Sequence, residues 1–577
     1  MKKLSLILFS VVLLFAGCRK DKIVVTETIY LGEEPEVLIN TSITGVVIDE
    51  NGQPIEGATV QLKQHGTATD DNGFFYMKDI LANENGAVIE VEKSGYFPTS
   101  KMVFPNLNEV EFVRIKLIES NESGLVSSNS GGVITLAGGA QIEFPADAFE
   151  LNGAAYGGQV AVHATYIDPL ADDLFERMPG SLLGVDANGQ IMGMTTFGMI
   201  GVEIFSNSGE ELELNSDKKA TLTFPVPAEI IGEAPSEIAL WHYDEELGYW
   251  MEEGRAELHG STYIASVSHF SFWNCDDPFP TVLLEGRAVN SGGEGVGNVQ
   301  VQLKRNTQAN QTGTAFTGPA GYFSGKVPKD EVLEMKVFDL CGNLISSTSV
   351  GPFSTDTKLN DIIVDLPVNV NFTGALIDCQ GSAVEKGYVK VYKNDDVFGY
   401  LIPDADGNIN ASVSFCEEGD FKVQGIDIKN SQASDERSLT FKENIDLGTI
   451  SACGTVIPTL LLELAGTDYI FSDVTASVVE DTSYMPPKII TTISAVNGSG
   501  YFSIGIDGEG TGNFEVIRIN AQVGTSSRIL SDPRIDVEIT RFDGPGGFIS
   551  GTFEGIVYDV SGGMDINLSG SFNAERD

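Results

Sequence analysis

Short segments in which apolar and polar residues alternate occur along most of the chain from residue 42 to residue 577. In the run 113–117, for example, Val, Ile and Leu lie on one face of an extended strand, and Arg and Lys lie on the other. Asn-Gly pairs and Gly-rich stretches separate such segments and are typical of turns. Apolar residues do not recur with a helical period, so no amphipathic helix longer than about three turns is predicted here. The expected fold class is therefore all-β.

An internal repeat subdivides this all-β region. In each copy a glycine is followed four residues later by Asp or Asn, and fifteen residues later by an alternating apolar segment. Asp and Asn at such positions are suited to closing a strand in a turn. The copies start at Gly45, Gly286 and Gly374, their turn residues are Asp49, Asn290 and Asp378, and their alternating segments are 60–63, 301–304 and 389–392. Three copies at one spacing predict three related domains.

The first copy resembles the carboxypeptidase regulatory-like domain. The segments 44–49, 54–60 and 69–75 carry the resemblance, which covers residues 42 to about 118. It implies a seven-stranded, transthyretin-like sandwich that serves other proteins as a noncatalytic accessory, for stability, spacing or protein contact. The regions near 282–366 and 371–450 are similar to weaker members of this family or to immunoglobulin-like sandwiches.

The region between the first two copies has other motifs. Segments 131–136 and 141–149 resemble the opening of the β domain shared by zonula occludens and netrin-receptor proteins. Segments 166–169, 241–244 and 249–250 are similar to cartilage intermediate layer protein and its bacterial relatives. In those relatives such a domain often follows a regulatory-like domain, which is the order predicted here.

We expect tandem transthyretin-like or immunoglobulin-like β-sandwich domains, arranged as beads on a string. The expected units are a lipoprotein signal peptide at 1–17, a lipidated tether at 18–41, a regulatory-like sandwich at 42–120, a central β domain at 121–279, a second sandwich at 280–367, a third at 368–455 and a C-terminal antiparallel β domain at 456–577.

The chain begins with features of an export signal. A basic start of two lysines precedes an apolar stretch, 4–16, that is too short for a permanent membrane-spanning helix. It leads into Leu-Phe-Ala-Gly-Cys at 14–18, which resembles the lipobox of bacterial lipoproteins. The resemblance implies that Cys18 becomes the first mature residue and carries lipid that anchors it in one leaflet. The alternative is a simple secretory signal that leaves Cys18 as an ordinary thiol.

The residue after Cys18 sets the expected location. Arg19 stands where lipoproteins retained in the inner membrane carry Asp. The expected location is therefore the outer membrane of a diderm bacterium, on its periplasmic or cell-surface face.

Charge and composition exclude one function class and disfavour another. The chain has 35 basic and 82 acidic residues, a formal net charge of −47, so it would repel nucleic-acid phosphates. It has only five histidines, which leaves few general bases near neutral pH. We predict no nucleic-acid partner, no cofactor and no catalytic residues.

Two segments are similar to metal-binding motifs. His242 and Glu245 match a His-x-x-Glu zinc signature, but the third histidine of metallocarboxypeptidases lies more than about a hundred residues downstream, and only His259 and His269 follow here. Solvated acids in a hairpin turn are the favoured interpretation. Asp404 and Asp406 begin a segment similar to a calcium loop, but Phe415 occupies the place of its bidentate Glu. A hairpin turn is favoured there, with weak calcium binding as the alternative.

All three tryptophans fall within residues 241–273. Alternation puts Trp241 and Tyr243 on one strand face, which suits a core and also a platform for stacking on sugars. We favour the core and keep Trp241, Tyr243, Trp250 and Trp273 as candidate glycan-binding residues.

Five cysteines remain if Cys18 is lipidated, and export permits disulfides. An odd number leaves at least one unpaired within a monomer. We predict one bridge among Cys379, Cys416 and Cys453, with the pair left open.

The function predicted from the sequence is that of a noncatalytic, lipid-anchored structural or interaction protein of the bacterial outer membrane, with protein or glycan partners. The alternative is a surface glycan-binding lipoprotein that works beside a nutrient importer. An enzyme that uses carboxylate pairs is the third hypothesis.

Overall fold

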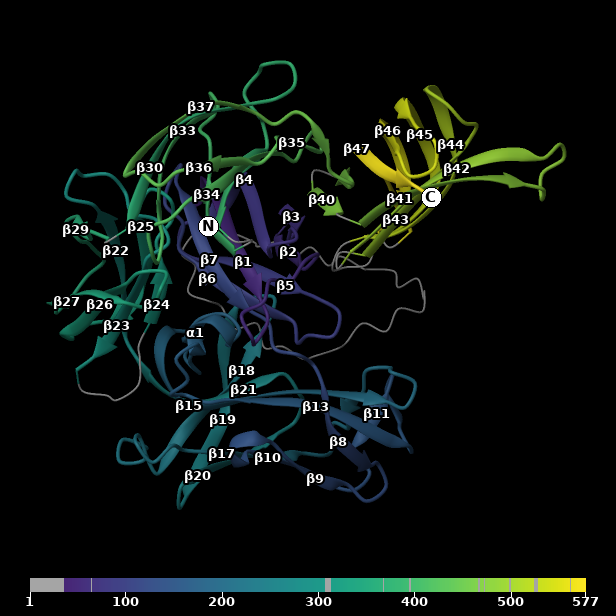
Figure 1. The fold of residues 1–577 in the computed structure, drawn as a ribbon. Helices are drawn as coiled ribbons and strands as arrows, with labels where there is room; N and C mark the ends of the chain where they lie inside the picture. Colours follow the sequence, from purple (N-terminus) through teal and green to yellow (C-terminus); the bar gives the residue numbers. More distant parts are fainter. Residues whose placement is uncertain are drawn as a thin grey trace, which may run out of the picture.

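A computed structural model describes residues 36–577 except 64, 307–312, 367, 394–395, 465–466, 472, 498–499, 524–527 and 561. The predicted signal peptide, Cys18 and most of the predicted tether lie outside the described residues. Strands dominate the described chain, which contains one short α-helix, α1, and one 3₁₀ turn, η1. The all-β fold class is confirmed. The strands form five groups along the chain (Figure 1).

The first group, which we call the first sandwich, has a three-stranded sheet β4-β1-β7 packed on a four-stranded sheet β3-β2-β5-β6. Its core contains Ile43, Val60 and Ile115, all fully buried. The strands are β1 (Leu38–Ile48), β2 (Thr59–Leu62), β3 (His65–Ala68), β4 (Phe74–Asn83), β5 (Ala87–Glu92), β6 (Thr99–Val103) and β7 (Val110–Lys116).

The second group, the central domain, has an 11-stranded sheet and a three-stranded sheet β12-β11-β16. In the larger sheet, β18 lies between β19 and β21. Its elements are β8 (Glu122–Ser127), β9 (Gly132–Thr135), η1 (Ala137–Gly139), β10 (Gln141–Phe144), β11 (Phe149–Leu151), β12 (Ala154–Ala155), β13 (Gln159–Ile167), α1 (Leu174–Arg177), β14 (Leu183–Val185), β15 (Ile191–Ser206), β16 (Glu213–Leu214), β17 (Ala220–Pro225), β18 (Glu237–Asp244), β19 (Tyr249–His259), β20 (Thr262–Val267) and β21 (Phe272–Phe279).

The third and fourth groups are the second and third sandwiches. The second sandwich has two four-stranded sheets, and the third has a three-stranded sheet and a six-stranded sheet. The second sandwich comprises β22 (Thr281–Val289), β23 (Gln300–Arg305), β24 (Gly313–Phe316), β25 (Tyr322–Pro328), β26 (Leu333–Phe338), β27 (Leu344–Val350), β28 (Thr357–Lys358) and β29 (Ile362–Ile363). The third comprises β30 (Asn369–Ile377), β31 (Gly387–Lys393), β32 (Asp396–Leu401), β33 (Asn408–Ser414), β34 (Phe421–Asp427), β35 (Gln432–Ala433), β36 (Arg437–Leu439), β37 (Asn444–Ser451) and β38 (Thr455–Val456).

The last group, the C-terminal sheet domain, is one nine-stranded sheet. Strand β47 pairs with β39 and β46, and at its end with β41, so the sheet closes around its own apolar core. The strands are β39 (Thr459–Leu464), β40 (Thr467–Phe471), β41 (Asp473–Asp481), β42 (Lys488–Asn497), β43 (Gly500–Asp507), β44 (Gly512–Val523), β45 (Arg528–Phe542), β46 (Phe548–Asp559) and β47 (Met564–Arg576).

The structure gives a physical reason for the repeated glycines. Gly45 pairs with Phe75 across two strands, and a Cβ atom added to Gly45 would lie 2.6 Å from that ring. A Cβ on Gly286 would likewise lie 2.3 Å from the ring of Phe323. The third copy has no aromatic residue in the matching strand, and there the backbone of Gly448 makes the close approach to Gly374. In the first two copies the glycine therefore makes room for the aromatic side chain opposite it.

The repeated Asp and Asn residues close turns of one kind. Oδ1 of Asp49 accepts hydrogen bonds from the backbone N–H groups two and four residues later, at 2.8 and 2.7 Å. Asn290 and Asp378 make the same pair of bonds in the second and third sandwiches. The side chain thus fixes the backbone of the turn, as the sequence pattern predicted.

The first sandwich lies at the centre of the molecule and contacts all four other units. Phe97 and Ile118 share a buried cluster with the central domain. The ring of Phe112 meets Phe316 of the second sandwich edge to face, and Phe74 lies in a buried cluster with the third. Strand β3 lies against β40 of the C-terminal sheet domain. Figure 1 shows this arrangement around the purple strands. The expected beads on a string are therefore in contact, which corrects the arrangement but not the fold class.

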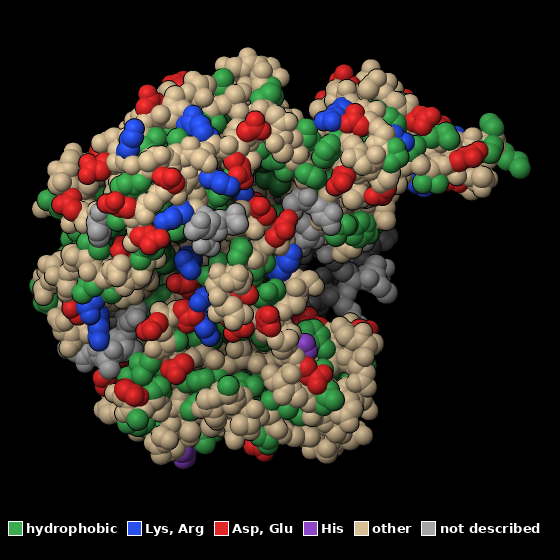
Figure 2. Space-filling view, viewed as in Figure 1, with side chains coloured by type: hydrophobic (Ala, Val, Ile, Leu, Met, Phe, Trp, Pro, Cys, Tyr) green, Lys and Arg blue, Asp and Glu red, His purple; other side chains and the backbone are tan. Residues whose placement is uncertain are grey.

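The surface has the charge that the composition predicts. Figure 2 shows Asp and Glu side chains spread over much of the visible face, with Lys and Arg between them. No helix among the described residues is long and apolar enough to span a membrane.

Candidate functional sites

The predicted aromatic residues lie in the core of the central domain. Trp241, Trp250 and Trp273 are fully buried, and Tyr243 is 3% exposed. Each indole N–H donates to a backbone carbonyl: Trp241 to Asp276, Trp250 to Ser181 and Trp273 to His269, at 3.0 to 3.2 Å. The favoured core interpretation fits these positions. The glycan platform needs correction, because rings packed on both faces leave no surface for a sugar.

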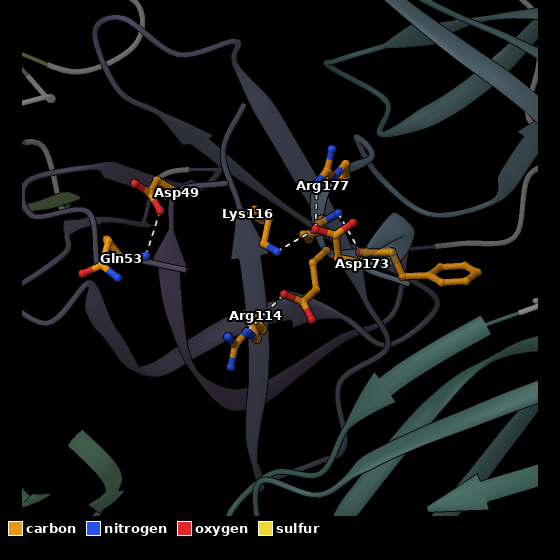
Figure 3. Close-up of polar contacts among 9 residues, drawn as sticks. Asp49, Gln53, Arg114, Lys116, Asp173 and Arg177 are labelled. Atoms are coloured by element: carbon orange, nitrogen blue, oxygen red, sulfur yellow. Dashed lines mark hydrogen bonds and ion pairs between the residues drawn. The ribbon is translucent and has the colours of Figure 1, made fainter. Parts of the chain in front are cut away.

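A charged joint connects the first sandwich to the helix α1 of the central domain. The Nζ atom of Lys116 and a guanidinium nitrogen of Arg177 each lie 2.7 Å from Oδ2 of Asp173. Arg114 lies 3.1 Å from a carboxylate oxygen of Glu176. Figure 3 shows these side chains converging between β7 and α1. Burial opposes ionisation, but hydrogen bonds from Arg177 and Lys116 lower the pKa of Asp173 below its ordinary value.

Lys101 extends this joint into the protein interior. Its side chain leaves β6, is 6% exposed, and donates hydrogen bonds to the carbonyls of Phe175 and Met178 at the end of α1. Burial, partly offset by the charge of Glu176, lowers the pKa of Lys101 to about 7. Three basic side chains of the first sandwich therefore bind this short segment of the central domain.

A second polar joint connects the first and third sandwiches. The Tyr388 hydroxyl donates to Oδ2 of Asp70 at 2.7 Å, and Lys390 lies 2.7 Å from Oδ1 of Asp71. The ring of Phe74 stacks on Tyr400 beside them. A cavity of about 360 Å³ lies next to these groups and extends to the start of the C-terminal sheet domain. Ion pairs and aromatic packing together fix the third sandwich on the first.

Two disulfides form within the described part of the chain. Cys379 bonds to Cys453 within the third sandwich, and both belong to the trio in which we predicted a bridge. Cys416, the other member of that trio, bonds to Cys341, so it links the third sandwich to the second. Of the cysteines that the structure describes, Cys275 is free, and it is buried in the central domain.

The calcium candidate is a hairpin turn. Oδ1 of Asp404 accepts the backbone N–H groups of Asp406 and Asn408 at 3.0 and 2.8 Å. Its Oδ2 accepts from the Asn408 side chain at 3.2 Å. Both carboxylate oxygens of Asp404 thus serve the turn.

One serine, histidine and glutamate meet without forming a catalytic triad. The hydroxyl of Ser120 lies 3.0 Å from Nδ1 of His163 and donates to Glu203 at 2.7 Å. In a triad the histidine lies between the nucleophile and the acid, whereas here the serine lies between them. The same Nδ1 atom also lies 2.8 Å from the Ser120 carbonyl, which makes it a donor and no base for the hydroxyl.

The two residues of the His-x-x-Glu motif do not form a site together. Glu245 lies in the exposed turn between β18 and β19, as the hairpin interpretation predicted. His242 instead meets Glu253 of β19 and His269 of the loop after β20, and the ligand atoms of the three residues lie within 4.8 Å of one another. The sequence did not reveal this group because its members belong to three separate segments.

Two sequence comparisons extend the resemblances noted above. Residues 42–117 match the profile of the carboxypeptidase regulatory-like domain. Over 232 residues the chain is 25% identical to human cartilage intermediate layer protein 2, a match that covers 38% of this chain and 20% of that protein. The chain thus spans about a fifth of the length of that relative.

Solved structures overlap with this chain only loosely. The Bacillus anthracis TIE protein covers 72% of the chain, with 51% of its own length, 8% identity and a TM-score of 0.15. BcpA, the major pilin subunit of Bacillus cereus, covers 72% with 99% of its own length, 11% identity and a TM-score of 0.13. TM-scores this low support no conclusion about function. What the comparisons show is a carboxypeptidase regulatory-like domain at the start of an all-β chain, with weak similarity to cartilage intermediate layer protein 2.

Proposed function

We propose that this chain is a noncatalytic structural or interaction protein, held at the outer membrane of a diderm bacterium by lipid on Cys18. The observation that carries the proposal is the central place of the first sandwich, which contacts all four other units. Its family serves as a stabilising or spacing module, and here it has the position that such a role requires. The chain becomes one body that can present its outer strands and loops at fixed distances from the membrane.

Covalent and electrostatic features support the same role. The Cys341–Cys416 disulfide joins two sandwiches, and such a crosslink suits an exported protein. The net charge of −47 favours solubility and repels anionic surfaces, so an acyl anchor and not charge would hold the protein at the membrane.

The glycan-binding alternative has lost the residues on which it rested. Its four candidate side chains are at most 3% exposed. The Ser120, His163 and Glu203 group gives the enzyme hypothesis no support, since it has the wrong order for a triad. The structural role is therefore the function best supported.

Lipid labelling in cells tests the anchoring. Cells that express the chain are grown with a radiolabelled or alkyne-tagged fatty acid, and a Cys18→Ala variant serves as the matched control. We expect label and outer-membrane fractionation for the native chain, and neither for the variant. Processing that resists a lipoprotein signal-peptidase inhibitor, with release of the native chain into the medium, would contradict anchoring.

Small-angle scattering of the chain from residue 36 onward tests the single-body architecture separately. We expect one compact particle whose radius of gyration matches the arrangement in Figure 1. A scattering profile of units tumbling on flexible linkers would contradict the proposed rigid scaffold, whatever the result of lipid labelling.

A further inference from the structure

Two histidines and one glutamate converge at the surface of the central domain, apart from the joints described above. Nδ1 of His242 lies 2.9 Å from Oε2 of Glu253, and Nε2 of His269 lies 3.1 Å from the same oxygen. The side chains of His242, Glu253 and His269 are 23%, 42% and 41% exposed, so the group lies at the surface of the protein. Two imidazole nitrogens and a carboxylate oxygen thus face one point at the surface.

The strand geometry explains why these residues meet. Strand β18 pairs with β21 on one side, where His242 is opposite Trp273, and with β19 on the other. Between β18 and β19 the register shifts, because Ala239 pairs with Arg255 and Trp241 with Glu252. Leu240 therefore faces two residues, Glu253 and Gly254, which is a β-bulge, and Gly254 has a φ of +97°. His242 pairs with Met251, so alternation along β19 places Glu253, two residues later, on the strand face that carries His242.

A buried tryptophan holds the two histidines in place. The Trp273 ring centroid lies 5.6 Å from that of His242 and 4.8 Å from that of His269. Its indole N–H donates to the His269 carbonyl at 3.2 Å, which fixes the loop between β20 and β21. Ser268 in that loop donates to the other oxygen of Glu253 at 3.3 Å. The group is therefore supported by surrounding contacts, as ligands of a metal usually are.

The donor set favours a transition metal over calcium or magnesium. Zinc binds His nitrogen at about 2.0–2.1 Å and Glu oxygen at about 2.0–2.2 Å, and sites with two His and one Glu leave a fourth position to water. Tetrahedral ligands at these distances are about 3.3 Å apart. Here Glu253 lies 2.9 and 3.1 Å from the two histidines, and all three ligand atoms lie within 4.8 Å of one another. Calcium and magnesium prefer oxygen ligands alone.

One of the three proposed ligand atoms lacks a hydrogen bond. Nδ1 of His242 is buried and has no hydrogen-bond partner at a favourable angle, despite its closeness to the Glu253 carboxylate. A metal ion would satisfy this nitrogen.

We propose that His242, Glu253 and His269 form a zinc site with three protein ligands and a water in the fourth position. A bound ion ties β18, β19 and the loop after β20 together at the surface of the central domain. The site is independent of the role proposed above for the whole chain, because it involves no residue of the joints between units.

Zinc titration of the full mature chain, prepared without a histidine tag and first treated with a chelator, tests the proposal. Calorimetry is done in excess calcium, which occupies weak carboxylate sites on this acidic surface. We expect one zinc ion per chain, and at least about a 10-fold loss of affinity in Glu253→Gln and in His269→Ala, since even supporting residues of metal sites are worth about 10–100-fold. X-ray absorption should show two imidazoles bound to the metal.

His259→Ala is the matched control. His259 also has a carboxylate partner, Glu257 at 3.3 Å, but this pair is 60% and 73% exposed, and no described residue joins it as a third ligand. This variant should bind zinc as the native chain does. Circular dichroism and unfolding with chelator present should show that all variants fold alike.

The proposal is overturned if the native chain binds no stoichiometric zinc. It is also overturned if Glu253→Gln and His269→Ala, folded like the native chain, keep its affinity, or if His259→Ala loses as much affinity as they do.

Discussion

The first sandwich shares a buried apolar cluster with the central domain, whereas the apolar core of the C-terminal sheet domain contains residues of that domain alone. Phe97 and Ile118 of the first sandwich pack among Trp241, Trp250 and other residues of the central domain. The core of the C-terminal sheet domain contains only residues from 460 to 574. A core that is shared couples the unfolding of two units, while a separate core lets a unit open alone.

Polar contacts also differ between the joint of the first sandwich with the central domain and the joint of the third sandwich with the C-terminal sheet domain. The first joint has a buried lysine and several ion pairs, in addition to its shared core. Between the third sandwich and the C-terminal sheet domain, Ser571 donates to the Lys429 carbonyl at 3.2 Å and Asn573 to the Ser431 carbonyl at 3.4 Å. A cavity of about 540 Å³ lies beside this C-terminal joint. The chain therefore combines a stiff block with a C-terminal unit that is held less tightly.

Of the changes predicted here, Trp250→Ala should have the largest effect on the stability of the two units that share a core. Trp250 is fully buried in the shared cluster and its indole N–H bonds the Ser181 carbonyl at 3.0 Å. Truncating such a side chain costs about 3–5 kcal/mol in the free energy of unfolding. Because the cluster is shared, hydrogen exchange should rise in both the central domain and the first sandwich, as mass spectrometry of peptides can show.

Phe553→Ala is the control for that experiment. Phe553 is buried in the C-terminal core, so the same measurement should show increased exchange there alone. Equal loss of protection in the first sandwich would show that the C-terminal sheet domain is not an independent unit.

Removing either of the two disulfides should have the next largest effect on stability, and the two removals can be compared directly. Their sequence separations are 75 and 74 residues, so the loop-closure model gives each about 4 kcal/mol, which engineered pairs often do not reach. Replacing Cys379 and Cys453 by Ser should destabilise the third sandwich by about 2–4 kcal/mol. Replacing Cys341 and Cys416 by Ser should also loosen the second sandwich.

Denaturant unfolding followed by peptide hydrogen exchange distinguishes these two losses. If the Cys341 and Cys416 double variant altered only the third sandwich, the disulfide between units would contribute nothing to the stiffness of the block.

Lys101 should give the first joint a dependence on pH. Its pKa is about 7 in the folded protein and near 10.5 when the chain unfolds. Between these values the unfolded chain binds more protons, so stability should increase as pH rises from 7 towards 10, by at most about 1.4 kcal/mol per pH unit from this group. Urea unfolding at several pH values, compared with Lys101→Met, isolates the contribution. A slope that persists in the variant would show that other groups cause it.

Features that depend on local sequence were predictable here. Alternation in 113–117 predicted strand β7, and Asp49 and its equivalents close the turns that their spacing predicted. These patterns involve residues close in the chain, so the physical cause is visible in the sequence. Burial of the tryptophans followed the same logic, since large aromatic residues in strands usually pack in cores.

Features that depend on contacts between units were not predictable. In the sequence, Lys101 is an ordinary lysine in a strand, and only the position of α1 explains its burial. Cys341 bonds to Cys416 because the second and third sandwiches lie side by side. The zinc candidate depends on the pairing of β18 with β19 and on the position of the loop after β20, which together bring His242, Glu253 and His269 close to one another. No periodic pattern in the sequence reports which strands pair or in what register.

The smallest expected effect is on the C-terminal joint. Ser571→Ala with Asn573→Ala removes two side-chain hydrogen bonds, which are worth about 0.5–1.5 kcal/mol each. We expect almost no change in the unfolding of either unit, but a larger radius of gyration by small-angle scattering, because these bonds set how the two units meet. Arg114→Ala with Lys116→Ala is the matched change at the first joint, where the shared core should keep the radius unchanged. If Ser571→Ala with Asn573→Ala left the scattering unaltered, the contact of β3 with β40 would be what holds the C-terminal sheet domain in place. The two joints would then differ less than their hydrogen bonds indicate.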